Sequence, residues 1–206
     1  LPGHGEDPAP PSAQTLAGYV DRIADVVRSS AGPVVLAGHS LGGLVTSAVA
    51  EAMPERISRL VYIAGLLPRD GDSLVRICSV DPGNPVNTAT VRTPDGKAVS
   101  LDPARLRGIF YNDCPEADVE YATARLCPEP IGAMFQTVHV TPEGFGRVPR
   151  AYIRCTEDRA LPLFIQQQMI DATPCDTVLT LPTGHSPFLA APERLAAMLH
   201  SLTQER

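Results

Sequence analysis

The chain has 206 residues, which is the size of one domain with room for an inserted segment. Hydrophobic residues make up 44% and charged residues 19% of the chain, a globular balance that argues against intrinsic disorder. No apolar run reaches the roughly 18 residues that a membrane helix needs, and the net charge of −6 gives a nucleic-acid partner little electrostatic support. No leader with a charged start and an apolar stretch is visible, so we expect a cytoplasmic location.

The first third of the chain predicts alternating helices and strands. We expect, in chain order, a helix at 16–27, a strand at 34–37, a helix at 44–53 and a strand at 59–64. Either Ser12 or Thr15 is placed to cap the first helix, and Pro54 ends the second. Both strands are continuous apolar runs, which is typical of strands buried on both faces of a parallel sheet.

The middle of the chain loses this rhythm. Proline, glycine and aspartate are frequent between residues 68 and 149, and only 105–111 and 117–126 have the pattern of short helices. A segment this long is not expected to be one open loop. We therefore predict that 68–149 is a cap inserted into the domain.

The last third returns to the α/β rhythm. A strand is predicted at 151–155, a helix at 161–170, a strand at 177–181 and a final helix at 192–202. Strands that alternate with helices indicate a mostly parallel sheet with helices on both faces. The predicted organisation is an α/β core formed by 1–67 and 150–206, interrupted by the cap.

The cysteines do not suggest a framework of disulfides or a zinc site. Their number is odd and no C-x-x-C pair occurs, so most are expected to be small buried hydrophobic residues. One bridge, between Cys114 and Cys127, stays open as an alternative. The five cysteines are Cys78, Cys114, Cys127, Cys155 and Cys175.

A nucleophile motif lies between the first predicted strand and the second predicted helix. Residues 38–42 read Gly-His-Ser-Leu-Gly and fit the pattern G-x-S-x-G. In this setting Ser40 sits on a tight strand-to-helix turn, at the N-terminus of the helix, and the small residues around it leave room for the turn. We predict that Ser40 is a nucleophile and that the backbone N–H of Leu41 is an oxyanion donor.

A serine nucleophile needs a base, and His185 is the best placed histidine. It lies in a loop directly after the last predicted strand, and open parallel sheets bind ligands at the carboxyl ends of their strands. His39 neighbours Ser40 in sequence and is expected to pack beside the turn. His4, His139 and His200 lie at a turn, in the cap and on the last helix.

The imidazole in turn needs a carboxylate that fixes its tautomer. Asp158 follows the strand at 151–155, and the order serine, acid, histidine is that of the nucleophile-elbow enzymes. Glu157 is the nearest competitor, and Asp70 with Asp72 form an alternative acid position. We predict a triad of Ser40, Asp158 and His185, and no metal site.

These motifs resemble the α/β-hydrolase superfamily, and within it the plant methylesterases and hydroxynitrile lyases with their bacterial esterase relatives. The resemblance rests on residues 1–5, 38–43, 152–158 and 184–185, which span almost the whole chain. It implies the Ser40–His185–Asp158 triad, no cofactor, and a cap over an apolar pocket. The lyases have a lysine after the catalytic histidine, whereas this chain has Ser186, which weakens a lyase interpretation.

The resemblance also implies a strand beside 34–37, and a loop that supplies a second oxyanion N–H. The sequence starts at Leu1 and contains neither this strand nor this loop. The strand 34–37 is therefore expected to have a bare apolar edge. A preceding segment of a longer product, a second copy of the chain, or a shortened protein with altered function are the explanations left open.

The sequence favours a carboxylic-ester hydrolase that forms an acyl-enzyme on Ser40 and takes a small-molecule ester. Two alternatives remain: a lyase on the same triad, and a binding protein derived from a hydrolase fold that lost catalysis. The cap is expected to line the substrate pocket with its most apolar residues, which are Ile109, Phe110, Tyr111, Met134 and Phe135.

Overall fold

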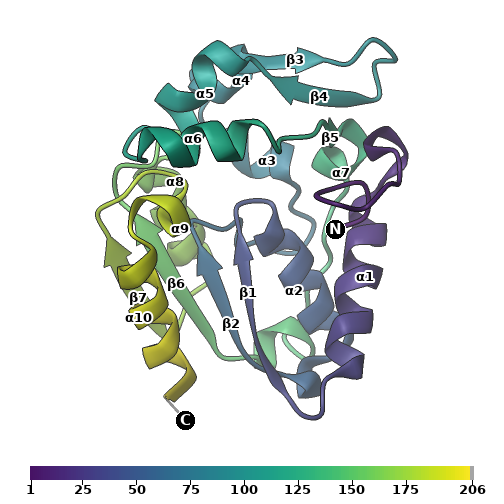
Figure 1. Ribbon diagram of the computed structural model, residues 1–206. Helices are drawn as coiled ribbons and strands as arrows, with labels where there is room; N and C mark the ends of the chain where they lie inside the picture. The colour runs from purple at the N-terminus through teal and green to yellow at the C-terminus, as the bar shows by residue number, and fades with distance from the viewer. Residues whose placement is uncertain (205–206) are drawn as a thin grey trace.

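A computed structural model describes residues 1–204 of the chain and is built around one parallel sheet (Figure 1). Its four strands are β1 (Val34–His39), β2 (Ile57–Ile63), β6 (Arg150–Cys155) and β7 (Thr177–Leu181). They lie side by side in the order β1-β2-β6-β7, and every pairing is parallel. The predicted α/β class is confirmed, and the strands lie where the apolar runs placed them.

Helices cover both faces of this sheet. Helices α1 (Leu16–Ser29), α2 (Gly42–Ala52) and α8 (Leu163–Ala172) share one large apolar cluster, whereas α10 (Pro192–Gln204) packs on the other face. Thr15 is the N-cap of α1, because its hydroxyl accepts a hydrogen bond from the amide of Gly18 at 3.0 Å. The two-faced core explains why the strands read as continuous apolar runs.

Alternate residues of one strand belong to the two apolar clusters on opposite faces of the sheet. In β2, Leu60 and Tyr62 belong to the cluster with α1 and α2, whereas Val61 and Ile63 belong to the cluster with α10. All four are buried, which removes apolar side chains from water on each face. The central strands β2 and β6 are therefore buried on both faces of the sheet.

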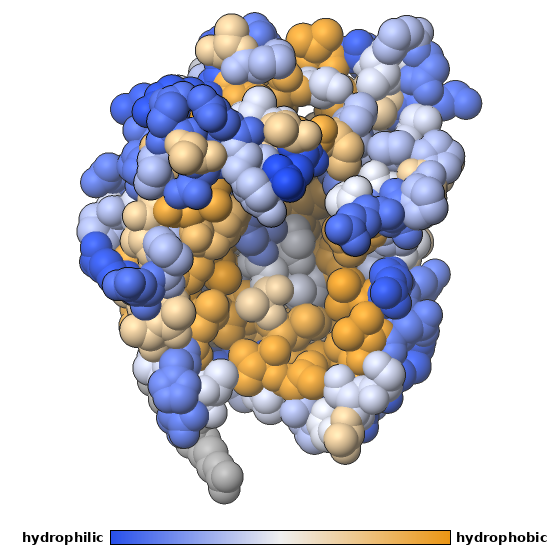
Figure 2. All heavy atoms as spheres, in the orientation of Figure 1, coloured by the Kyte–Doolittle hydropathy of each residue, from blue (hydrophilic) through white to orange (hydrophobic). Residues whose placement is uncertain are grey.

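Strand β1 differs from this pattern. The prediction that 34–37 is buried on both faces was wrong, because Val34, Val35 and Leu36 are half-buried and Ala37 is exposed. The reason is that β1 is an edge strand, paired only with β2 within residues 1–204. Figure 2 shows apolar side chains gathered on this face, between α1 and α10.

Most of the chain between β2 and β6, from α3 to α7, forms the layer that lies over the carboxyl ends of the strands in Figure 1. Two of its helices, α5 (Pro103–Phe110) and α6 (Glu116–Thr123), occupy the two predicted helical stretches within a few residues. The remaining short helices are α3 (Leu74–Cys78), α4 (Pro85–Ala89) and α7 (Ile131–Phe135). This segment also contains a small antiparallel sheet that the sequence did not predict. Its strands are β3 (Thr90–Arg92), β4 (Ala98–Leu101) and β5 (Glu129–Pro130), in the order β3-β4-β5.

The minor elements complete the chain. A short helix, α9 (Pro187–Ala190), follows the loop after β7, and single 3₁₀ turns lie at Pro11–Ala13, Pro54–Arg56 and Phe145–Arg147. All five cysteines are free thiols, so the alternative of a Cys114–Cys127 bridge is not realised in the structure. Across the described 204 residues, no helix is both long and apolar enough to span a bilayer.

Candidate active site

The backbone bends sharply at Ser40, between β1 and α2. Ser40 has a φ of 50°, in the left-handed region that a non-glycine residue adopts only where the surroundings enforce it. Its carbonyl accepts hydrogen bonds from the amides of Gly43 at 3.0 Å and Leu66 at 2.9 Å. The strain is therefore held by the first turn of α2 on one side and by the segment after β2 on the other.

Two glycines make this close approach possible. A Cβ at Gly43 would lie 2.4 Å from the carbonyl oxygen of Leu66, and one at Gly38 would lie 2.6 Å from the carbonyl oxygen of Gly42. Gly42 itself has open space where its Cβ would be. The sequence-based expectation that the turn needs small residues holds for Gly38 and Gly43, whereas the space around Gly42 does not require a glycine.

The residues predicted as acid and base are in direct contact. His185 Nδ1 and Asp158 Oδ2 lie 2.7 Å apart, and the side chains are 4% and 0% exposed. Asp158 comes from the loop after β6 and His185 from the loop after β7, at the carboxyl ends of two neighbouring strands. Because the carboxylate accepts the Nδ1 proton, the Nε2 atom of the ring is left as the proton acceptor.

The loop that carries Asp158 is closed by a network of its own. The second carboxylate oxygen, Oδ1, accepts hydrogen bonds from the amides of Ala160 and Leu161, each at 2.8 Å. The fully buried Gln166 on α8 spans the base of the loop, where it contacts both backbone groups of Cys155 and donates to the carbonyl of Leu161 at 2.7 Å. Sequence reasoning missed Gln166, which reads as one more polar residue of a helix.

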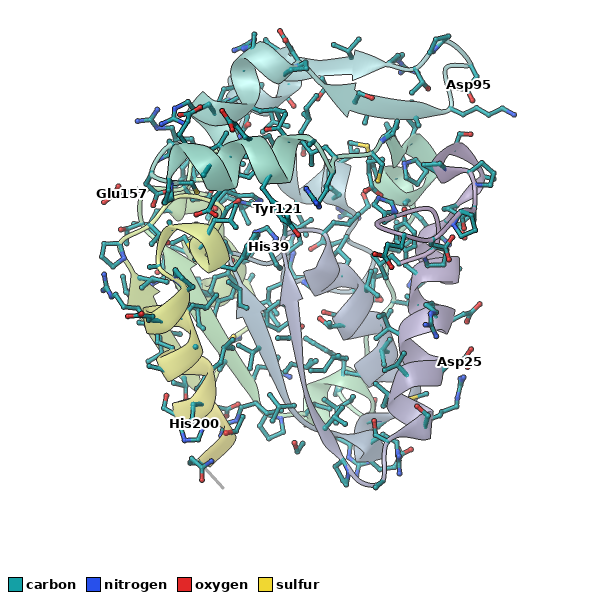
Figure 3. All side chains as sticks on the ribbon, in the orientation of Figure 1. Asp25, His39, Asp95, Tyr121, Glu157 and His200 are labelled. Atoms are coloured by element: carbon teal, nitrogen blue, oxygen red, sulfur yellow. The ribbon has the colours of Figure 1, made fainter. Side chains whose placement is uncertain are left out.

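His39 contacts His185 from the side of the sheet. Its Nε2–H donates to the carbonyl of His185 at 2.7 Å, and the two rings lie 4.6 Å apart. Burial, and secondarily the neighbouring His185, lower the pKa of His39 to about 3. His39 is therefore neutral across the physiological range. Figure 3 shows His39 at the end of β1 that faces the cap.

The competing carboxylates are engaged elsewhere. Glu157 is exposed and points away from the sheet at the outer edge of the molecule in Figure 3. Asp70 accepts from the amide of Val140 at 3.1 Å and pairs with His139, whereas Asp72 is buried between Arg69 and Arg76. Of the candidate acids, Asp158 is the one that the structure brings into contact with His185.

A cavity of about 940 Å³ lies between the sheet and the cap. Ser40, Leu41 and His185 form part of its wall, together with many apolar side chains such as Leu66, Leu74, Val86, Leu101 and Leu106. Among the described residues that line this wall, Arg125 has the only guanidinium group and Glu129 has the only carboxylate. The cavity has the size and the apolar lining of a small-molecule site.

The cap residues expected to line the pocket divide into two groups. Phe110 and Met134 do line the cavity, and the Phe110 ring meets the His185 ring edge to face at 5.4 Å. Ile109 and Tyr111 instead pack inside the cap, at 4% and 7% exposure, and Phe135 turns to solvent with 60% of its surface exposed. The expectation for these three was wrong because apolar character alone does not reveal which face of a short helix points inward.

A small polar network interrupts the apolar lining of the cavity, where His4 and Glu129 form part of the wall. His4 Nε2 lies 3.1 Å from Glu129 Oε2, and the buried Tyr19 hydroxyl donates to Glu129 Oε1 at 3.2 Å. The hydrogen bond to Glu129 raises the pKa of His4, against the smaller opposing effect of burial. The pair joins the first turn of the chain to β5 of the cap.

This pair predicts a pH-dependent contribution to stability. Because the folded pKa of His4 is raised above the unfolded value of about 6.5, the pair stabilises the fold fully below that pH, and the stabilisation is lost as the pH rises through the folded pKa. The side chains are 24% and 30% exposed, so we expect about 0.5–1 kcal/mol. The free energy of unfolding in urea should therefore include this contribution at about pH 5.5 and lack it at about pH 8.5, and His4→Gln should remove that pH-dependent contribution. His139→Gln, at an exposed pair, serves as the control, and identical pH profiles of His4→Gln and the parent would contradict the assignment.

The residues described contain no cluster of three or more histidine, cysteine or acidic side chains that could hold a metal ion. The site contains a serine on a strained turn, a buried imidazole–carboxylate pair, and the amides at the start of α2. Leu41 directly precedes that helix, where backbone N–H groups have no intrahelical acceptor.

The profile of the alpha/beta hydrolase family matches residues 1–198. The chain belongs to this family. This α/β hydrolase is 30% identical over 197 residues to a pyrethroid hydrolase of Sphingobium wenxiniae, covering 86% of its own length and 66% of that protein. It is 29% identical over 177 residues to methylesterase 1 of Arabidopsis thaliana, covering 79% and 66% of the two chains. The resemblance inferred from the sequence motifs is confirmed.

Solved structures resemble the α/β hydrolase over nearly its full length. The crystal structure of polyneuridine aldehyde esterase matches with a TM-score of 0.87 at 24% identity, covering 99% of this chain and 86% of that one. A pyrethroid hydrolase structure matches with a TM-score of 0.83 at 26% identity, covering 98% and 83%. The chain spans a smaller part of several curated relatives, between 40% and 59% of the length of four chloroplastic proteins of Arabidopsis thaliana.

Proposed function

We propose that this α/β hydrolase hydrolyses carboxylic esters through an acyl-enzyme on Ser40. The observation that carries the proposal is the buried 2.7 Å contact between His185 and Asp158. His185 also lines the same cavity as Ser40. A base oriented by a carboxylate, in the same cavity as a serine on a strained turn, supports activation of the hydroxyl for acyl transfer. The names of the relatives, methylesterase and pyrethroid hydrolase, agree with this reaction class.

The proposed reaction has two halves. In the first, His185 Nε2 takes the proton of the Ser40 hydroxyl as its oxygen bonds to the ester carbonyl carbon, and the Leu41 N–H donates to the oxyanion. The imidazolium, stabilised by Asp158, then gives that proton to the leaving alcohol as the C–O bond breaks. In the second half, His185 takes a proton from water, which attacks the acyl-enzyme, and returns it to Ser40 as the carboxylic acid leaves.

The cavity supports a substrate class. Its volume is about 940 Å³ and most of its lining is apolar, so we propose esters with bulky, uncharged acyl or alcohol groups. The phenyl ring of Phe110, beside the imidazole, supports an apolar substituent close to the reacting carbon. A lyase reaction has less support, because Ser186 follows the base where lyases of this group have a lysine.

A serine-reactive fluorophosphonate tests the nucleophile. We expect one adduct, on Ser40, and hydrolysis of p-nitrophenyl acetate that disappears in Ser40→Ala. We also expect a higher kcat/KM for p-nitrophenyl hexanoate than for the acetate, since the longer acyl chain fills more of the apolar cavity. Activity should fall as the pH is lowered, because protonated imidazole cannot act as the base.

The same experiment separates the alternatives. Hydrolysis that survives Ser40→Ala would refute the mechanism. Absence of both labelling and turnover would favour a binding protein that has kept the fold and lost catalysis. Ser47→Ala is a suitable control, because Ser47 is fully buried on α2, where its hydroxyl contacts Tyr62, and should not be labelled.

A further inference from the structure

The turn that joins α5 to α6 in the cap touches the loops of the proposed acid and base. Cys114 and Tyr111 are buried at its two ends, and the amide of Cys114 closes it by donating to the carbonyl of Tyr111 at 3.2 Å. Asn112 and Asp113 lie between them, half-buried. We call residues 112–114 the clamp turn. Each of its three side chains contacts a loop that follows β6 or β7.

Two residues of the clamp turn bind the backbone on either side of His185. The carboxylate of Asp113 accepts the amide of Gly184 at 2.7 Å, and the thiol of Cys114 donates to the carbonyl of Ser186 at 3.8 Å. The amide of Gly184 belongs to a buried residue, so its acceptor comes from the cap rather than from water. The residues before and after the base are thus both tied to the cap.

The third residue of the clamp turn reaches the loop of the acid. Asn112 Nδ2 donates to the carbonyl of Glu157 at 3.3 Å, one residue before Asp158. The approach to the base loop is so close that a Cβ on Gly184 would lie 2.4 Å from Asn112 Oδ1. One turn of three residues therefore contacts the immediate neighbours of both members of the imidazole–carboxylate pair.

We infer that the clamp turn is a positioning element for the base, and that Asp113 is its principal residue. His185 is then held from two sides, with His39 donating to its carbonyl from the sheet and the clamp turn binding its neighbours from the cap. Neither Asp113 nor Asn112 has a part in the proposed chemical steps. Their effect passes through the position of the imidazole relative to Ser40, where a shift of about 1 Å costs on the order of 100-fold in rate.

The inference rests on the proposed function, and a spectroscopic readout separates the two. The proton shared by His185 Nδ1 and Asp158 should give a downfield ¹H resonance, which is assigned by its loss in Asp158→Asn and does not depend on any substrate. We expect Asp113→Ala to broaden or shift this resonance and to lower kcat up to about 100-fold, with little change in KM. Reaction of Ser40 with a small fluorophosphonate should slow in parallel.

The matched variants decide between positioning and general stability. Asp113→Asn keeps an oxygen that can accept the Gly184 amide and should recover most of kcat and the resonance. Glu120→Ala, an exposed residue on α6 of the same cap, should leave both unchanged. Asn112→Ala, which removes the contact to the acid loop, provides a second test if Asp113→Ala does not fold.

The outcomes that would overturn the inference are distinct from failure of the proposed function. Wild-type kcat and an unchanged resonance in Asp113→Ala and Asn112→Ala would refute the clamp. A rise in KM for p-nitrophenyl hexanoate with normal reactivity toward the small fluorophosphonate would assign the turn to pocket shape instead. An enzyme without turnover whose resonance still responds to Asp113→Ala would retain the clamp and refute the ester hydrolase.

Discussion

Asp158→Asn should lower kcat by about 10⁴-fold while leaving the fold intact. The amide oxygen of the new side chain replaces Asp158 Oδ1 as acceptor for the amides of Ala160 and Leu161, which leaves its NH₂ group facing His185 Nδ1. That nitrogen must then be an acceptor, so the ring proton moves to Nε2. An imidazole in this tautomer cannot take the proton of Ser40, and the imidazolium loses its buried counter-charge.

The measurement is kcat for p-nitrophenyl hexanoate, together with a thermal unfolding curve that checks the fold. Glu157→Gln is the matched control, because it changes the adjacent carboxylate, which is exposed and is expected to be silent. A loss of less than tenfold in Asp158→Asn, or an equal loss in Glu157→Gln, would mean that the base is oriented by some other group.

Gly43→Ala should damage both stability and catalysis, because the new methyl group meets backbone and not a side chain that can rotate. Its Cβ would lie 2.4 Å from the carbonyl oxygen and 2.7 Å from the amide nitrogen of Leu66. The same amide donates to the carbonyl of Ser40 at 2.9 Å, so the displacement loosens the strained turn itself. We expect a loss of about 3 kcal/mol in the free energy of unfolding, at the upper end of the usual cost of overpacking.

Gly42→Ala is the neighbouring control. It adds the same methyl group to the same helix, but into open space, and alanine has a higher helix propensity than glycine by about 1 kcal/mol. We therefore expect Gly42→Ala to be as stable as the parent or slightly more stable by urea unfolding. Equal destabilisation by the two substitutions would show that the spacing of small residues, rather than the contact with Leu66, governs this turn.

The parts of the site that could be predicted are those written in short stretches of sequence. Ser40, Asp158 and His185 each lie just after an apolar strand, Ser40 directly and the other two in the loop that follows, and parallel strands bring their carboxyl ends to one edge of a sheet. The alternation of strands and helices is visible for the same reason, since a sheet covered on both faces needs uninterrupted apolar strands. Both features can be predicted from local sequence patterns, even though the strands lie far apart along the chain.

The parts that could not be predicted depend on contacts between segments that no local pattern connects. Gln166 looks like an ordinary helical residue, yet it closes the acid loop with three hydrogen bonds. Asp113 is one of many acidic residues in a loop-rich region, and only the folded cap brings it to Gly184. The short strands of the cap escaped notice because two to four residues are too few for a period to be seen.

The contacts of residues 112–114 have a consequence for engineering substrate range. The cap forms much of the cavity wall, so exchanging it between relatives is the obvious way to redesign which molecules fit. In this chain such a graft would also replace the hydrogen-bond partners of Gly184, Ser186 and Glu157. A chimera should therefore keep the native residues 112–114 at the seam, or import the donor's two loops along with its cap.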